Sequence, residues 1–208
     1  MPLLSKVKRR LGVGARFSGQ RYEKQDLRSM TAQGSEWVEC EFRGCKMGLG
    51  DFVGSRFIGC IFIDCQMDMT NFSNCMVTSC AFSGCSLEQA AFARADIIST
   101  KFVDCRMAYS SFLGATGRKH LSFTSCNLHG ADLDVLECDR GLPEFYDSNL
   151  WGVKVAIGCQ VFNGHFDLKT AQRFTAMINR MHPDSRLASF AGEQAEVVER
   201  LMGGTDVE

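Results

Sequence analysis

The hexapeptide FVDCRM, at residues 102–107, is one copy of a pattern that returns every twenty residues. Close relatives are FRGCKM at residues 42–47, FIDCQM at residues 62–67 and FSGCSL at residues 82–87. Each copy begins with Phe, has Cys in fourth place and ends with Met or Leu. The fold must therefore bring the same residue types to equivalent places once every twenty residues.

Within this unit an apolar residue recurs at every fifth position from Phe17 to Phe112, and two residues before it stands, in most cases, a small side chain. A period of five matches neither the 3.6 residues of a helical turn nor the alternation of a strand. A chain that turns a corner about every five residues buries all these positions, and four corners close one square coil. Stacked coils place like residues in columns, such as Tyr22, Phe42, Phe62, Phe82 and Phe102, or Leu27, Met47, Met67, Leu87 and Met107.

Two insertions interrupt the spacing without ending it. FTSCNL begins 21 residues after FVDCRM, and FYDSNL begins 22 residues later still. Insertions in a solenoid bulge out as loops while the stacking continues. We therefore expect irregular loops within residues 113–122 and residues 136–144.

The pentads ARADI at residues 93–97, HGADL at residues 129–133 and MTNFS at residues 69–73 resemble the motif of the pentapeptide-repeat family. The resemblance covers about residues 15–157. It implies an all-β solenoid, a right-handed quadrilateral β-helix of about seven coils. At about 4.8 Å per coil the rod would be about 34 Å long, filled by side chains and without room for a cofactor.

The ends of the chain differ from its middle. Residues 1–14 form a basic tail, since residues 1–32 carry eight Lys or Arg against two acids, 8 − 2 = +6, in a chain of net charge −1. We interpret the tail as solvated, with an anionic-membrane or nucleic-acid contact as the alternative, and expect no direct nucleic-acid binding by the protein. The opening lacks the apolar core of a secretory signal, and no run is long enough for a membrane span, so we expect a cytoplasmic protein.

After the β-helix, predicted for residues 15–162, the spacing of residues 163–208 becomes helical. We predict two helices that cap the exposed edge of the last coil and also form a homodimer. The quinolone-resistance and mycobacterial fluoroquinolone-resistance branches of the family dimerise through C-terminal segments, and this arrangement resembles theirs. The candidate dimer residues are Phe174, Ile178, Phe190, Val197 and Leu201.

The eleven cysteines are interpreted as packing residues. Their column positions point inward, where a small and weakly polar side chain packs well. Parallel side chains on adjacent coils do not meet the torsion of a disulfide, and no CxxC pair suggests a metal site. The four histidines are scattered and belong to no recognisable catalytic motif, and no phosphate-binding loop is present. We therefore expect neither a metal nor an enzyme.

The remaining candidates are outward residues. The acids Asp64, Asp68, Glu88 and Asp104 favour either a solvated face or mimicry of the DNA backbone. Outward Arg and Lys residues dilute that field, and outward apolar residues indicate an ordinary protein-binding patch as a further alternative.

Recognition residues commonly lie on the irregular segments of a rigid scaffold. The two predicted loops therefore supply the candidates Arg118, Lys119, His120, Arg140 and Leu142, with the outward Trp151 beside them. We expect that shortening residues 117–121 to a single Gly leaves the melting temperature nearly unchanged.

Three functions remain open. The first is a protein-interaction scaffold, and the family resemblance implies DNA gyrase or topoisomerase IV as the most concrete partner and protection from a drug or toxin as the role. The second is a generic binding or secreted-effector module. The third, a redox-active cysteine enzyme, is tested by thiol titration.

Overall fold

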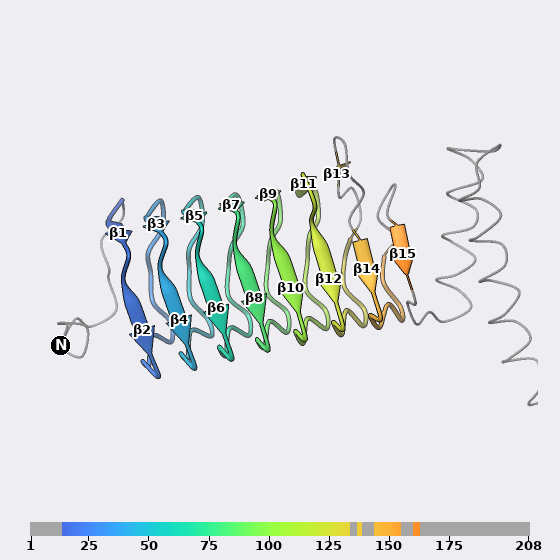
Figure 1. Ribbon diagram of the computed structural model, residues 1–208, viewed down its shortest axis with the longest axis horizontal. Coiled ribbons are helices and arrows are strands. Elements are labelled where there is room, and N and C mark those ends of the chain that lie inside the picture. Colours follow the sequence, from blue (N-terminus) through green and yellow to red (C-terminus); the bar gives the residue numbers. More distant parts are fainter. Residues whose placement is uncertain (1–13, 134–136, 139–143, 155–159, 163–208) are drawn as a thin grey trace, which may run out of the picture.

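The computed structural model describes residues 14–133, 137–138, 144–154 and 160–162 (Figure 1). These residues form a parallel β-solenoid, and none of them is helical. No helix in this part of the chain is long and apolar enough to cross a membrane. The predicted C-terminal helices and their dimer residues, from Phe174 to Leu201, lie outside the described residues.

Two parallel sheets form two sides of the rod. Each strand pairs with the strand one coil earlier and one coil later, so Phe42 lies beside Phe62 and Trp37 beside Phe57. The seven-stranded β1 sheet contains β1 (Arg16–Ser18), β3 (Glu36–Val38), β5 (Arg56–Ile58), β7 (Met76–Thr78), β9 (Asp96–Ile98), β11 (Thr116–Arg118) and β13 (Glu137–Cys138). The eight-stranded β2 sheet contains β2 (Arg21–Glu23), β4 (Glu41–Arg43), β6 (Ile61–Ile63), β8 (Ala81–Ser83), β10 (Lys101–Val103), β12 (Ser122–Thr124), β14 (Glu144–Tyr146) and β15 (Gln160–Phe162).

Two ladders of isolated parallel bridges form the other two sides. One, here the Lys46 ladder, follows the β2 sheet along the chain, and the next, the Asp51 ladder, leads back to the β1 sheet. The Lys46 ladder joins Asp26, Lys46, Gln66, Ser86, Arg106, Asn127 and Asn149, and the Asp51 ladder joins Thr31, Asp51, Asn71, Ala91, Ser111, Asp132 and Lys154. The four-sided cross-section predicted from the five-residue period is thus confirmed.

About six turns are complete, against the seven predicted by counting columns. The difference lies at the C-terminal end, because the seventh turn includes residues 134–136 and 139–143, which fall outside the described part. Strand β14 nevertheless keeps the predicted register, with Phe145 beside Phe123.

The interior consists of stacked side chains. Rings of the Phe42 column lie nearly parallel, and the Phe82 ring has its centroid 4.6 Å from that of Phe62 and 4.7 Å from that of Phe102. Rings of the neighbouring Phe72 column meet this column edge-on, with 6.4 Å between the centroids of Phe72 and Phe82. Offset-stacked and edge-to-face contacts are the favourable arrangements of aromatic rings. The predicted columns therefore form one continuous core.

The corners join consecutive sides. The residue at most corners has positive φ, for example Gly54 at 68° and Asn74 at 57°. Such a backbone favours Gly, Asn and Asp, since a Cβ is crowded there. Backbone hydrogen bonds then run between coils, as from the N–H of Gly19 to the carbonyl of Val38 at 2.9 Å.

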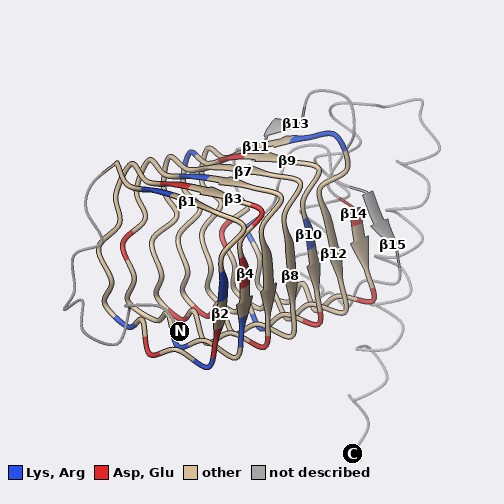
Figure 2. Ribbon diagram, turned by 60° about the vertical axis from the view of Figure 1, so that its left-hand side comes forward, with Lys and Arg blue, Asp and Glu red and all other residues tan. Residues whose placement is uncertain are grey.

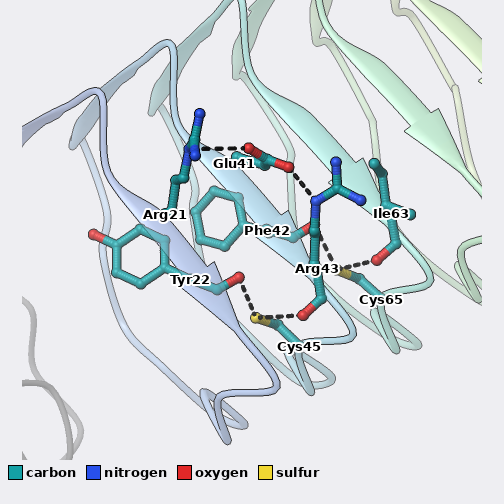
Figure 3. A network of polar contacts seen from close by, with 8 residues as sticks. All are labelled: Arg21, Tyr22, Glu41, Phe42, Arg43, Cys45, Ile63 and Cys65. Atoms are coloured by element: carbon teal, nitrogen blue, oxygen red, sulfur yellow. Dashed lines mark hydrogen bonds and ion pairs between the residues drawn. The ribbon is translucent and has the colours of Figure 1, made fainter. Parts of the chain in front are cut away.

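Charged side chains bridge coils on the outside of the first turns (Figure 3). Glu41 of β4 accepts hydrogen bonds or ion pairs from Arg21 of β2 and from Arg43. Arg16 likewise lies 2.9 Å from Glu36. Because the arginines of these pairs are largely exposed, each pair stabilises the fold only slightly. Charged side chains do protect an edge strand against pairing with another chain.

Candidate interaction surface

The cysteines belong to the packed interior and not to a reactive site. Nine of them are described, and all nine are free and buried. Their thiols donate to carbonyls of the preceding coil, as Cys45 Sγ does to Tyr22 O at 3.4 Å and Cys65 Sγ to Phe42 O at 3.4 Å (Figure 3). Burial raises the pKa of the Cys75 thiol to about 12. The reactive thiolate of Cys75 is therefore disfavoured at neutral pH.

The described residues contain no group of three or more His, Cys, Asp and Glu side chains that could hold a metal ion. The core also offers no space for a cofactor, because the side chains of the columns are almost completely buried and in contact with one another. Chemistry in this part of the chain is confined to its outer surface.

The first predicted loop is not a loop. Residues 116–118 form strand β11, which pairs with β9 and β13, and the inserted residue is absorbed at the corner, where Lys119 and His120 both have positive φ. A corner can take one more left-handed residue without breaking either sheet, so the expected bulge is wrong. Arg118 lies on the outer face of β11, 3.4 Å from the carboxylate of Asp96.

Two inward positions next to this insertion differ in side-chain size from the equivalent positions of the preceding coil. Gly117 occupies the inward position that Ile97 holds in the preceding coil, and it is buried without a side chain. Around the same corner Leu121 is fully buried where the preceding coils have Cys80 and Thr100. Residues 117 and 118 thus belong to a strand and Leu121 belongs to the core. These positions favour a loss of stability when residues 117–121 are shortened, and the expectation of an unchanged melting temperature stays a prediction.

His120 borders a hollow of about 600 Å³ over the β2 sheet. The floor is formed by strands β10, β12 and β14, and Ser99 and His120 line it from the corner. Lys101 and Glu144 provide opposite charges, and the hydroxyl of Tyr146 donates to Glu144 at 3.1 Å. The loop residue His120 is thus brought together with the sheet, whereas Lys119 is exposed at the corner.

The acidic candidates fall into two groups. Asp64 and Asp104 occupy the corner between the β2 sheet and the Lys46 ladder, and the structure adds Asp147 to the same column. We call these three residues the acidic corner. Exposed carboxylates stand there on every second coil, about 9.6 Å apart, and the residues between them are Gly84 and Ser125.

Gly84 is needed at this corner for space as well as for its backbone. A Cβ there would collide with Oδ1 of Asp64, so the carboxylate lies over the glycine of the next coil. No ion pair joins Asp64, Asp104 or Asp147 to a cation among the described residues. In Figure 2 the ribbon segments of acidic and basic residues are interspersed along the coils.

Asp68 and Glu88 lie on the Lys46 side and not at the acidic corner. Asp68 is half-buried and accepts hydrogen bonds from the Ser86 hydroxyl and from the N–H of Glu88. Glu88 is exposed. Trp151 is exposed as expected, with 41% of its surface accessible. Arg140 and Leu142 lie outside the described residues.

The side of the rod formed by the Lys46 ladder has the acidic corner at one edge. The sequence analysis did not identify candidate residues at its other edge. Leu49, Met69 and Tyr109 occupy the corner between the Lys46 and Asp51 ladders, with 61%, 50% and 58% of their surfaces exposed. We call them the apolar corner. The signal was present in the sequence, because all three stand two places after the inward residue of their pentads, where other corners have Gly or polar residues.

Comparison with protein families agrees with this geometry. The model of pentapeptide repeats matches residues 70–108 in eight copies. This segment of the chain has the sequence pattern of pentapeptide repeats. The described coils continue the same register on both sides of the matched segment. No curated protein sequence matches this chain.

Solved pentapeptide-repeat structures are similar at low sequence identity. One is a trypsin-treated variant of QnrB1, a plasmid-mediated fluoroquinolone resistance protein, with 15% identity, 84% of this chain and 93% of that chain covered, and a TM-score of 0.38. Another is from the Arabidopsis thaliana thylakoid lumen, with 18% identity, 63% and 70% covered, and a TM-score of 0.25. HetL of Nostoc, involved in heterocyst differentiation regulation, has 11% identity, 76% and 86% covered, and a TM-score of 0.23.

Proposed function

We propose that the protein is a non-catalytic protein-interaction scaffold that binds a type II topoisomerase, DNA gyrase or topoisomerase IV, and protects it from a drug or toxin. The observation that carries the scaffold role is the division between inside and outside. Inward positions are filled by stacked side chains, so the described coils can act only through the side chains on their outer surface. A rigid rod holds those side chains at fixed spacing.

The acidic corner supports the choice of partner. Three exposed carboxylates, Asp64, Asp104 and Asp147, stand in one corner column, and no ion pair joins them to a cation among the described residues. A file of negative charges along a rod presents the electrostatic feature that a basic DNA-binding groove attracts, since DNA binding is dominated by phosphate charge. The pentapeptide-repeat resemblance contributes the idea of gyrase itself. Such a partner would place the protein in the cytoplasm, where nine free thiols remain reduced.

A generic protein-binding or secreted-effector module is the second candidate. It is favoured by the cations that lie between the acids, among them Arg56, Arg94 and Arg106, and by the half-exposed Ile61. These residues weaken a purely acidic field and offer an ordinary mixed surface.

A supercoiling assay tests the proposal. Purified protein is titrated into DNA gyrase with a fluoroquinolone present, and we expect supercoiling to be restored. Asp64→Asn with Asp104→Asn should weaken this protection about tenfold or more. The matched control, Glu23→Gln with Glu39→Gln, removes two exposed charges elsewhere and should have little effect. Absence of protection by the unaltered protein would exclude the topoisomerase role. Equal loss of protection in both variants would show that only the net charge of the protein matters and not the position of the acidic corner.

A further inference from the structure

The apolar corner is unusual in its backbone as well as its exposure. Leu49, Met69 and Tyr109 have φ values of 59°, 57° and 58°, a left-handed conformation that large apolar side chains rarely adopt. The other three corners, within the described coils, have only Gly, Ser, Asn, His or charged residues. Residues that strain the backbone and expose apolar surface together indicate a role outside folding.

Carboxylates border this corner on both sides. Asp51 stands on the Asp51 ladder, and Asp68 and Glu88 stand on the Lys46 side. None of the three takes part in an ion pair among the described residues; Asp51 accepts a hydrogen bond from Gln33 at 2.6 Å. An occupant should therefore combine apolar side chains with positive charge.

Residues 1–13 of this chain have that composition. The segment MPLLSKVKRRLGV contains Leu3, Leu4 and Val7 together with Lys6, Lys8, Arg9 and Arg10, and it contains no acid. We propose that this segment binds along the apolar corner, with its apolar residues on Leu49 and Met69 and its cations beside Asp51, Asp68 and Glu88.

The point of attachment allows this path. Gly14 lies at the corner between the Asp51 ladder and the β1 sheet, where its N–H donates to the carbonyl of Gln33 at 3.1 Å. The Asp51 side separates it from the apolar corner, together with a rise along the rod of about two coils to Leu49 and three to Met69. The side is at most about 17 Å wide and the rise is about 10–14 Å, so the path is about 20–22 Å, whereas thirteen extended residues reach about 43 Å. About six or seven residues cover this path, which brings Val7 to the apolar corner and lets Leu3 and Leu4 lie along it.

The side that must be crossed is suited to a chain lying on it. Its outward residues in the coils that follow Asp51 are short, and they include Val53, Asn71, Ser73, Ala91 and Ala93. Backbone can approach closely over such side chains. The opposite side of the rod, the β2 sheet, has longer and more charged residues such as Arg21, Arg43 and Lys101.

Limited trypsin digestion of the full chain tests the proposal, since the segment has four cleavage sites at Lys6, Lys8, Arg9 and Arg10. Mass spectrometry would follow the rate of cleavage there. Leu49→Asn with Met69→Asn removes the apolar surface but suits a left-handed backbone, so we expect an unchanged or higher Tm and at least fivefold faster cleavage. The control is Ile61→Thr, which removes exposed apolar surface from the β2 sheet and should leave the rate unchanged.

Further arms separate the occupants. Glu88→Gln should give a smaller acceleration, and 1 M salt should reduce the effect of that substitution because charges are then screened within about 3 Å. Equal cleavage rates in the unaltered protein and the Leu49/Met69 variant would overturn the proposal. Protection that rises with protein concentration, together with a dimer in solution, would overturn it in favour of the segment of a second copy. Loss of gyrase protection in that variant with unchanged cleavage would overturn it in favour of a foreign partner.

Discussion

Replacing Phe82 by Ala tests the column packing at its centre. The ring is 1% exposed, stacks on Phe62 and Phe102, and meets Phe72 and Phe92 edge-on at 6.4 Å. Burying an aromatic ring of about 200 Å² is worth up to about 5 kcal/mol at 25 cal/mol per Å². Phe→Ala substitutions in cores cost about 3–5 kcal/mol.

We expect the upper half of that range, about 4–5 kcal/mol, because neighbouring coils are fixed by backbone ladders on all four sides and cannot collapse into the cavity. Urea unfolding followed by circular dichroism would measure the loss. Phe82→Leu keeps most of the volume and should cost less than about 2 kcal/mol.

Phe17→Ala provides the internal comparison. Phe17 is half-buried in the first coil and stacks on Trp37 alone, with 4.0 Å between the centroids. Its removal should cost less than half as much as that of Phe82. If the two Ala variants lose equal stability, the rod does not depend on continuous columns and the packing argument is wrong.

Other changes probe the thiols, the insertion and the corners. Burial raises the pKa of the Cys75 thiol to about 12 in the folded chain, against the ordinary value of 9.0 in the unfolded chain, so its contribution to stability is complete below pH 9 and is lost as pH rises toward 12. Cys75→Ala should therefore flatten the alkaline fall in unfolding free energy by about 1.4 kcal/mol per pH unit. Identical slopes in the two proteins would contradict this. Leu121→Thr should lower the unfolding free energy by about 2–3 kcal/mol. Adding Gly117→Ile should recover part of this loss, because the pair then has the same sizes as Ile97 and Thr100 of the preceding coil. A double-mutant cycle would measure this coupling, and strict additivity of the two substitutions would refute it. Gly130→Ala should destabilise more than Gly54→Ala in thermal melts, because both have positive φ but only at Gly130 would the new Cβ meet the Tyr109 ring at 2.6 Å; equal melting temperatures would show that the ring moves freely.

The interior could be predicted from sequence because it depends on a count. A buried residue every fifth place, from Phe17 to Phe112, leaves one arrangement that buries them all, and the register Phe42, Phe62, Phe82 follows from the twenty-residue identity. The same count predicted the thiols inward.

The insertion was mispredicted because length alone does not determine where an extra residue goes. Residue 120 could bulge from the coil or lengthen a corner, and the outcome depends on two backbone conformations at Lys119 and His120 that no spacing reveals. Gly117 holds the buried inward position of β11 that Ile97 holds one coil earlier. Compensation between two positions is visible only when the coils are superposed.

Candidate surface residues were harder to choose because outward positions obey no period. Asp64 and Asp104 were named as outward acids, and Asp147 was missed because 22 residues, and not twenty, separate the fifth and sixth copies of the hexapeptide. Leu49 and Met69 were missed because exposed apolar residues were sought on the strands and not at the corners.

The corners contain more information than the flat sides. Each corner requires a left-handed backbone, which Gly, Asn and Asp adopt more easily than other residues. Asp64 and Asp104 therefore suit the corner backbone and also supply a surface charge. Leu49 and Tyr109 are unfavourable in that backbone conformation and so destabilise the fold. The acidic corner and the apolar corner bound the same side of the rod, the one formed by the Lys46 ladder. A partner protein that lies on this side and covers a standard area of about 800 Å² would reach both edges, since a side is at most about 17 Å wide. Residues 1–13 bound at the apolar corner would therefore compete with a topoisomerase at the acidic corner, and the Lys46 side would be where the two proposals meet.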